Sequence, residues 1–518
     1  SQALVSLSTG LVADDTVNAD DAKAVGYKIL CSMVGQSVAE YKFSQKHQVK
    51  TLASLLHVKT TTGECIELDP GHLYQRLLVM GIGEIPLPDL LRYELCCLPA
   101  SLFDNRTLMR TGEKSDLIHY LLKLVPTCLV PALPKTGVQF VIDGGGLLHK
   151  FAWPKHITYG DICKLYVQHV RSIYGRALVV FDGYEGSSTK DEAHRRRAGT
   201  DVGPNVSISR EIHLTMSKKA FLGNEANKQS LINLLGDEMS KEGIQVKHAD
   251  GDADYMICKT ACDLINEKPT AVVAEDSDVF QLLTRHSSTE DYDLYMVTAK
   301  NNICITTLKK KLDPSLSEGL LFLHAISGCD TTSIPYGIGK VTVLKKYNAL
   351  KSYVATFMNQ ASSKERIKEA GEKAILEIYG CPSLQSIDAA RVEKFQMKVA
   401  ASSGYVAPEK LPPTSDAASF HSYRTYHQVQ TWRGNDLSPV EWGWSATPNG
   451  LVPIKMVKSA APEPLLRTIR CNCSGRCDKR TCTCRKNGLQ CTPACGQCKG
   501  LTCLNAPCEI ADDEENEE

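Results

Sequence analysis

The spacing of hydrophobic positions changes near residue 138 of the chain. Before about residue 135, leucines recur at helical spacing in "LYQRLLVMGIGEIPLPDLLRYELCCLP" and "KSDLIHYLLKLV", which predicts a helical N-terminal region over 1–135. From Val138, short β-rich runs such as "VQFVIDGGG", "ALVVFDGY" and "TAVVAEDSDVF" alternate with helical runs. This alternation predicts an α/β fold, in which helices flank a parallel sheet.

The first helix after residue 138 has a clear apolar face. This face contains Ile162, Leu165, Tyr166, Val170 and Ile173, and Gly175 follows the helix as an expected C-cap. The polar stretch 183–247 is too long for a simple loop, so we expect an inserted helical element there.

Beyond the sheet the pattern predicts helices up to about residue 405. A glycine-bearing turn, "TTSIPYGIGK", separates two of them. Residues 356–406 are expected to form a helical extension. The segment 407–463 shows no sustained period, so we expect a connector that packs through Trp432, Trp442 and Trp444.

Length and composition indicate the class of protein. A chain of 518 residues exceeds one ordinary hydrophobic core, so we expect roughly three or four structural units. Lys and Arg number 59, as do Asp and Glu, and this balance excludes a polycationic chain. Neither a bilayer-spanning apolar run nor a signal peptide is visible. We therefore expect an intracellular protein, nuclear or otherwise, without a membrane partner.

Aspartates end three of the apolar strands. Asp143 and Asp182 each follow one strand, and the pair Asp276 and Asp278 follows the third. Because functional groups of parallel sheets gather at the carboxyl ends of the strands, these four acids are expected to converge.

Three further aspartates adjoin helices. Asp252 and Asp254 precede the apolar face of "DADYMICKTACDLI", and Asp330 follows "LLFLHAISGC". Any single aspartate here is equally well explained as a turn or helix-cap residue, but seven at such positions favour a metal site. Carboxylates suit Mg²⁺ or Mn²⁺, and two such ions can hydrolyse a phosphodiester. We therefore expect two Mg²⁺ or Mn²⁺ ions.

Five segments resemble, in order, the acidic motifs of the flap endonuclease family, which are structure-selective 5′ nucleases of the PIN-like fold. They are "VIDGGGLLHKF", "VVFDGY", "DADYMIC", "AEDSDVF" and "SGCDTTSIPYGIGK". The resemblance covers about 138–350. It implies a PIN-like nuclease domain over 136–355, with an arch-like insert at 183–247 and a helix-turn-helix at 313–350. The implied metal-site carboxylates are Asp143, Asp182, Asp252, Asp254, Asp276, Asp278 and Asp330.

The same resemblance implies nucleic-acid contacts. Lys190 and Arg197 match the pair that contacts the scissile phosphate diester in the family's helical arch, with Arg195 and Arg196 as competitors. The turn residues Gly337, Gly339 and Lys340 match the helix-turn-helix that grips duplex DNA. Taken alone, the basic run is more typical of a solvated helical face, and a GxG of a helix C-cap and tight turn. Their positions just after Asp182 and Asp330 favour the functional interpretation.

This sequence departs from the family in two respects. The family more often has Glu where Asp252 and Asp254 stand. It also begins almost at its first strand, whereas about 135 residues precede Val138 here. The preference for flaps is therefore not implied.

Ten of the 21 cysteines lie between Cys471 and Cys508. Clustered thiols in an intracellular chain favour metal over disulfides. Zinc in structural sites takes four ligands, so nine cysteines satisfy three Zn²⁺ ions if three of them bridge. The expected ligands are Cys471, Cys473, Cys477, Cys482, Cys484, Cys491, Cys495, Cys498 and Cys503, with Cys508 spare.

The cysteine spacing resembles the tesmin-type CXC domain, which binds DNA through zinc-clustered loops. This resemblance implies a zinc-cluster domain over 464–508, followed by an acidic tail at 509–518. Some family members insert a tyrosine into the minor groove where Thr481 stands here. Basic residues surround the cysteines, and those expected to bind nucleic acid are Lys479, Arg480, Arg485 and Lys486.

Together these features predict a divalent-metal-dependent, structure-selective nuclease that hydrolyses DNA and holds it through a zinc module. Two alternatives remain open at the level of sequence. One is a catalytically inactive DNA-binding protein on a nuclease scaffold, and the other is a ribonuclease, because the PIN-like fold serves both substrates. No metal-site aspartate has been replaced by a neutral residue, which favours activity.

Overall fold

The computed structural model of the chain divides into two compact units, each built from segments that are distant in sequence. Residues 1–62 and 127–310 form the first, here named the sheet unit, and residues 63–126 and 311–518 form the second, the helical unit. The helix-turn-helix expected at 313–350 therefore belongs to the helical unit. The described residues are 19–35, 49, 70–104, 107–183, 189–190, 202–401, 406–447, 450–473, 477, 482–492, 495–499 and 503–505.

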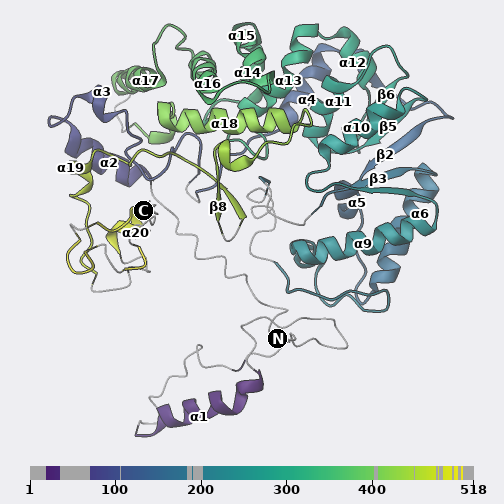
Figure 1. Cartoon of the computed structure of the whole chain (residues 1–518), viewed down its shortest axis with the longest axis horizontal. Coiled ribbons are helices and arrows are strands. Elements are labelled where there is room, and N and C mark those ends of the chain that lie inside the picture. Colours follow the sequence, from purple (N-terminus) through teal and green to yellow (C-terminus); the bar gives the residue numbers. More distant parts are fainter. Residues whose placement is uncertain are drawn as a thin grey trace, which may run out of the picture. The chain divides into compact units, whose positions relative to one another are not determined.

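The sheet unit is organised around a seven-stranded, mostly parallel sheet of order β1-β7-β6-β5-β2-β3-β4 (Figure 1). Strands β2 to β6 pair in parallel, while β7 pairs antiparallel with β6 and β1. The mixed α/β class predicted from the sequence is thus confirmed. The strands are β1 (Leu129–Val130), β2 (Gln139–Asp143), β3 (Leu178–Phe181), β4 (Gln245–His248), β5 (Thr270–Val273), β6 (Leu294–Val297) and β7 (Asn302–Cys304).

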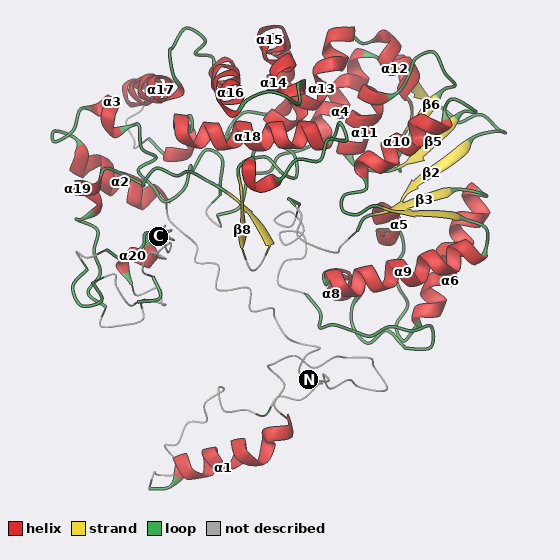
Figure 2. Ribbon diagram, viewed as in Figure 1, coloured by secondary structure: helices red, strands yellow, loops and turns green. Residues whose placement is uncertain are grey.

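Helices cover both faces of this sheet (Figure 2). Helices α6 and α9 share one core with inward residues of β2 and β3, including Ile142, Val179 and Phe181. Helix α10 contacts β2 and β5 and packs against α11. The helices that begin in this unit are α1 (Ala22–Met33), α5 (Gly144–His149), α6 (Tyr159–Tyr174), α8 (Lys218–Leu222), α9 (Glu225–Lys241), α10 (Asp254–Leu264), α11 (Ser277–His286) and α12 (Ile305–Lys311).

Helix α6 follows its sequence signals closely. Thr158 caps its N-terminus by accepting the N–H of Asp161 at 3.1 Å, and Gly175 ends it with φ of +62°, so the predicted C-cap is confirmed. The fully buried stripe contains Ile162, Tyr166 and Val170, which are spaced by four residues. Of the other predicted face positions, Leu165 is 37% and Ile173 57% exposed.

The stretch expected as a helical insert also contributes to the sheet. It contains α8 and α9, as predicted, but its last residues form β4, which pairs with β3 at the edge of the sheet. Edge strand β4 has no fully buried residue, so its sequence "QVKH" lacks the apolar run that marks central strands.

The helical unit brings the N-terminal region against the C-terminal half of the chain. A buried ion pair joins Glu94 to Arg391, at 3.2 Å, and Glu94 also accepts the N–H of Thr414 at 2.7 Å. The helices are α2 (Pro70–Gly81), α3 (Leu87–Leu90), α4 (Ser115–Leu124), α13 (Pro314–Ile326), α14 (Lys340–Lys345), α15 (Tyr347–Met358), α16 (Lys364–Tyr379), α17 (Ile387–Ala401), α18 (Ser415–Thr431), α19 (Glu463–Leu466) and α20 (Thr483–Lys486).

The segment expected as a connector contains the most central helix of this unit. Helix α18 contacts α13, α15, α16 and α17 and is buried on nearly every side. A helix that is buried all round shows no polar face, which explains why no period was visible. A hairpin of β8 (Trp444–Thr447) and β9 (Gly450–Pro453) follows. The predicted burial of Trp432, Trp442 and Trp444 is confirmed.

No helix in the described parts of the chain is long and apolar enough to cross a membrane.

Candidate metal centres

Six of the seven predicted aspartates lie at the carboxyl edge of four neighbouring parallel strands, in the order β5-β2-β3-β4. Asp143 is the last residue of β2, and Asp182 directly follows β3. Asp276 and Asp278 come shortly after β5, while Asp252 and Asp254 come after β4. The sheet topology therefore gathers these six carboxylates on one edge, as expected for parallel strands.

Asp143 and Asp182 approach each other across a glycine. Asp143 caps helix α5 by accepting the N–H of Gly146 at 3.1 Å. Asp182 accepts the N–H of Ala253 at 2.9 Å. A Cβ added to Gly145 would lie 3.1 Å from Asp182 Oδ2 and 3.2 Å from Asp143 Oδ1. Because Gly145 has no side chain, oxygens of both carboxylates can lie close to its Cα at this edge of the sheet.

The other four aspartates are fixed by the starts of two helices. Asp276 is the N-cap of α11 and accepts the N–H of Asp278 at 2.8 Å. Asp254 is the first residue of α10, whose N-cap is Ala253, so Asp252 lies just before the helix. This arrangement confirms the prediction that Asp252 and Asp254 occupy the turn into a helix.

Three of these carboxylates, Asp143, Asp252 and Asp254, have raised pKa values. Burial raises the pKa of Asp143 to about 6, and the charge of Asp182 adds to this rise. Burial also raises the pKa of Asp254, with a further contribution from Asp252. The pKa of Asp252 is raised by burial in the same way, while Lys190 opposes the rise. Raised pKa values of this kind indicate that nearby positive charge does not fully compensate the negative charge of the ionised carboxylates.

This donor set fits hard divalent cations. Its ligands are carboxylate oxygens, which Mg²⁺ and Mn²⁺ prefer, and the space over Gly145 is one that a Cβ would fill. Within the described part of the chain, three or more ligand atoms lie within 4.8 Å of one another only in the cysteine cluster. The carboxylate oxygens are therefore more widely spaced than the cysteine sulfur atoms. Repulsion between negatively charged carboxylates favours such spacing.

Lys190 forms ion pairs with two of the aspartates at this edge. Its Nζ lies 2.6 Å from Asp252 Oδ1 and 2.7 Å from Asp254 Oδ2, and the residue is 8% exposed. The family resemblance implied that Lys190 contacts the substrate phosphate, whereas here its ammonium lies on two of the predicted metal ligands. The predicted arch residues Arg195, Arg196 and Arg197 lie outside the described residues.

The seventh aspartate, Asp330, belongs to the helical unit. It is 8% exposed, and its Oδ1 lies 2.7 Å from Lys114 Nζ. Lys114 comes from the N-terminal region and was not predicted as a site residue. A single lysine before a helix carries no recognisable sequence signal, because only the fold brings it to Asp330.

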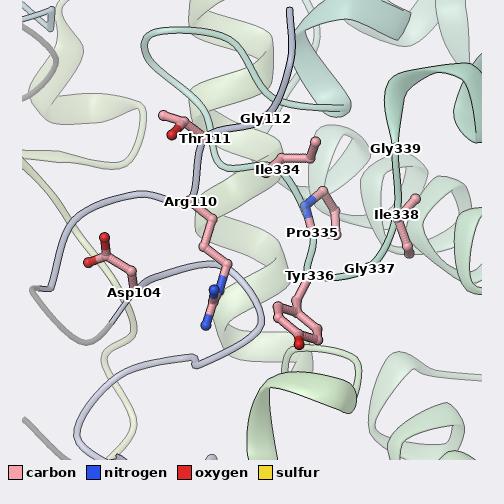
Figure 3. Close-up of a pocket in the computed structure, with 10 residues that line it drawn as sticks. All are labelled: Asp104, Arg110, Thr111, Gly112, Ile334, Pro335, Tyr336, Gly337, Ile338 and Gly339. Carbon is pink, nitrogen blue, oxygen red and sulfur yellow. The ribbon is translucent and has the colours of Figure 1, made fainter. Parts of the chain in front are cut away.

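The predicted glycine turn lines a pocket of about 390 Å³ in the helical unit (Figure 3). Gly337 has φ of +74°, and Gly337 and Gly339 have open space where a Cβ would lie. The opposite wall comes from the N-terminal region, and its Arg110 lies over the ring of Tyr336, 4.9 Å from the centroid. Arg110 also donates from Nε to the carbonyl of Ala100 at 2.8 Å.

Lys340, which was predicted to bind nucleic acid with this turn, is turned inward. It is 2% exposed, and its Nζ lies 3.1 Å from His324 Nδ1 and 3.2 Å from Ser327 Oγ. His324 in turn stacks on Trp432. In this conformation Lys340 links the turn to α13 through these contacts, and its ammonium is buried. The pocket is also lined by Arg110, a half-buried cation that no sequence motif indicated.

The predicted zinc ligands cluster in the helical unit. Three sets of four cysteines bring their sulfur atoms within 4.8 Å of one another, and Cys471 belongs to all three. Cys503 is a buried member of the cysteine cluster but is in none of the sets, and Cys508 lies outside the described residues. The sets are Cys471, Cys473, Cys477, Cys482; Cys471, Cys477, Cys491, Cys498; and Cys471, Cys484, Cys491, Cys495.

Thiol sulfur and its spacing fit zinc, which takes four such ligands. Because Cys471, Cys477 and Cys491 are shared between sets, ions in these sets would be bridged. Two of the predicted basic residues lie in α20. Lys486 is exposed, and Arg485 is half-buried. Lys479 and Arg480 lie outside the described residues.

Comparisons with known proteins give limited similarity. A family described as a domain of unknown function (DUF8702) matches residues 1–94. No curated protein matches the sequence. The similar solved structures include the catalytic core of Rad2 in complex with DNA substrate, at 13% identity and a TM-score of 0.33, covering 67% of this chain and 91% of that one.

Two further structures have comparable scores. A second complex of the Rad2 catalytic core with DNA substrate has 14% identity and a TM-score of 0.29, covering 61% of this chain and 95% of that one. The eukaryotic junction-resolving enzyme GEN-1, binding with cesium, has 15% identity and a TM-score of 0.27, covering 62% and 66%.

Proposed function

We propose that this protein is a divalent-metal-dependent nuclease that hydrolyses DNA phosphodiester bonds. The observation that carries the proposal is the gathering of six aspartates at the carboxyl edge of β5, β2, β3 and β4. A structural protein gains nothing from placing six like charges at one edge, because each raises the cost of ionising the others. A site that binds two divalent cations offsets that cost.

The chain's own residues would orient the reaction. Hydrogen bonds from Gly146, Ala253 and Asp278 N–H groups fix Asp143, Asp182 and Asp276 before any ligand binds. Such preorganised carboxylates hold ligands in place at little entropic cost. Bound Mg²⁺ or Mn²⁺, of which we propose two, would supply an activated water and offset the charge that develops on the phosphate.

We further propose that the cysteine cluster binds three Zn²⁺ ions and holds DNA as a CXC-type module. The close approach of the sulfur atoms, within 4.8 Å in each of three sets of four cysteines, supports metal binding, and the number of three follows from nine ligands of which three bridge. Lys486 and Arg485 beside the cluster would contact phosphates, together with Lys479 and Arg480. Because such contacts release counterions, this part of the affinity is expected to fall with salt concentration.

The glycine turn is proposed as a second DNA contact, in the helical unit. Gly337 and Gly339 leave their backbone open to a close approach. Arg110 on the facing wall of the pocket (Figure 3) supplies a guanidinium, which suits a phosphodiester through paired hydrogen bonds. The N-terminal region would thereby contribute to DNA binding.

The direct test is a cleavage assay on labelled single-stranded, duplex, flapped and RNA substrates with Mg²⁺ or Mn²⁺. The variant Asp276→Asn, Asp278→Asn is expected to lose activity by several orders of magnitude, because two metal ligands lose their charge. Asp161→Asn is the matched control, since Asp161 is an exposed helix residue that pairs with Lys164 and Thr158.

Cleavage of DNA by the wild-type protein and by Asp161→Asn, but not by the double variant, would support the proposal. Cleavage of RNA alone would replace DNA by RNA as the substrate. An absence of metal-dependent cleavage on every substrate would overturn the enzymatic function.

A further inference from the structure

We propose that Lys190 and the divalent metal compete for the same carboxylates, so that metal binding releases the lysine toward the substrate. The inference rests on the proposed function, since it assumes that Asp252 and Asp254 are metal ligands. It adds a step that links metal loading to substrate contact.

The contacts of Lys190 carry this proposal. Its ammonium bridges Asp252 Oδ1 at 2.6 Å and Asp254 Oδ2 at 2.7 Å. The side chains involved are little exposed, at 10% for Lys190, 21% for Asp252 and 10% for Asp254. Buried charge pairs are screened far less than surface pairs, so this bridge holds the lysine firmly on the two carboxylates.

The surrounding charges explain why an ammonium lies there. Asp182 and Asp278 both act electrostatically on Asp252, and Asp276 and Asp278 act on Asp254. A single ammonium compensates only part of this negative charge. A divalent cation compensates more, and its oxygen ligands are the same class of atom that Lys190 now contacts.

The two cations exclude each other at short range. A divalent ion held by Asp252 or Asp254 would lie close to the Lys190 ammonium, and like charges repel strongly in a site with little water. The lysine therefore has to leave its bridge when the metal binds. Once released, its nearest complementary ligand is the phosphodiester of a substrate.

This competition predicts an order of events. A metal-free enzyme keeps Lys190 on the carboxylates and presents no free ammonium to DNA. A metal-loaded enzyme presents both the metal and the lysine. Substrate contact through Lys190 thus follows metal binding and does not precede it.

Two measurements on the full chain test the proposal without an activity assay. The first is acylation of lysine amines, quantified by mass spectrometry with and without saturating Mn²⁺. Lys190 is expected to be protected in the metal-free protein and to become several-fold more reactive with Mn²⁺. Lys164, which is exposed and pairs with Asp161, is the internal control and should not change. Unchanged reactivity of Lys190 at saturating Mn²⁺ would overturn the proposal.

The second measurement is Mn²⁺ affinity by titration calorimetry. Lys190→Met is expected to bind Mn²⁺ roughly tenfold more tightly, the fold-change of one modest charge interaction, whereas Lys164→Met should match the wild type. Weaker or equal binding by Lys190→Met would contradict the competition. Wild-type protein that binds Mn²⁺ normally while Lys190 stays protected would refute this inference and leave the proposed function intact. Wild-type protein that binds no Mn²⁺ would overturn the metal site itself.

Discussion

At the proposed metal site, single residues set the space between the carboxylates. Asp143 and Asp182 need their oxygens near each other, and the space they share lies over Gly145. No sequence pattern distinguishes Gly145 from its neighbours in "DGGGLL". Its importance follows from the two oxygens that lie just over 3 Å from the position of a Cβ.

Gly145→Ala is expected to weaken Mn²⁺ binding at least tenfold and to reduce cleavage in proportion, because the added methyl group crowds both carboxylate oxygens. Calorimetry with Mn²⁺ and the cleavage assay would measure this. Gly251→Ala is the control, since Gly251 lies beside Asp252 but has open space where a Cβ would be. Equal losses in the two variants would show that crowding of Asp143 and Asp182 is not the cause.

His421 is expected to make the helical unit sensitive to acid. Burial lowers the pKa of His421 from 6.5 to about 4, and Arg424 adds to the effect. Between pH 6.5 and 4, His421 is protonated in the unfolded chain but neutral in the folded chain. The contribution of neutral His421 to the unfolding free energy is therefore fully present above pH 6.5 and is lost as the pH falls toward 4.

Replacing His421 should reduce this acid sensitivity. His421→Gln is expected to remove about 3 kcal/mol of the loss in unfolding free energy between pH 6.5 and 4. Urea unfolding followed by tryptophan fluorescence at several pH values would measure it. His119, which is exposed, supplies the control variant His119→Gln. A parallel pH dependence of His421→Gln and wild type would contradict the assignment.

At the scale of elements, the close packing of α16 against α18 depends on Gly371. A Cβ added there would lie 2.0 Å from Ser422 Oγ. Gly371→Ala should therefore lower the unfolding free energy by roughly 1–3 kcal/mol, despite the gain of up to about 1 kcal/mol in helix propensity. Thermal unfolding would show the loss. The double variant Gly371→Ala, Ser422→Gly should recover part of it, and no recovery would place the strain elsewhere.

The glycine turn and the N-terminal segment beside it act as one element in the proposed DNA contact. Arg110→Ala is expected to weaken binding to duplex DNA in the absence of added Mg²⁺ or Mn²⁺ and to reduce the slope of log affinity against log salt by roughly one. Fluorescence anisotropy over a salt series measures both. Arg92→Ala is the control, because Arg92 is 60% exposed and pairs with Asp89. An unchanged salt slope in Arg110→Ala would remove Arg110 from the interface.

At the scale of the whole molecule, the cysteine cluster is expected to hold its metal as one connected unit. Cys471 belongs to all three sets of four cysteines, whereas Cys473 belongs to one. Cys471→Ser should therefore lose most of the zinc, and Cys473→Ser roughly one ion. Metal analysis by mass spectrometry would measure the content per chain. Equal losses in the two variants would indicate separate, unbridged sites.

The sequence by itself determined the features that depend on local pattern. Apolar strands followed by aspartates predicted the parallel sheet and the edge at which Asp143, Asp182 and Asp276 lie, because strand direction alone brings carboxyl ends together. Helix caps such as Gly175 and the cysteine spacing are equally local. Helix α18 was missed because a helix buried on all sides has no amphipathic period, and β4 because an edge strand needs no apolar run.

Only the tertiary structure decided which charges meet. Lys190 bridges Asp252 and Asp254, and Lys114 reaches Asp330, although these partners are far apart in sequence. The sequence predicted that Lys340 binds nucleic acid, but the fold buries its side chain against His324. Partners of this kind depend on long-range packing, which a pattern of neighbouring residues does not encode. The aspartates of the candidate site were therefore predictable, and the lysines that compensate them were not.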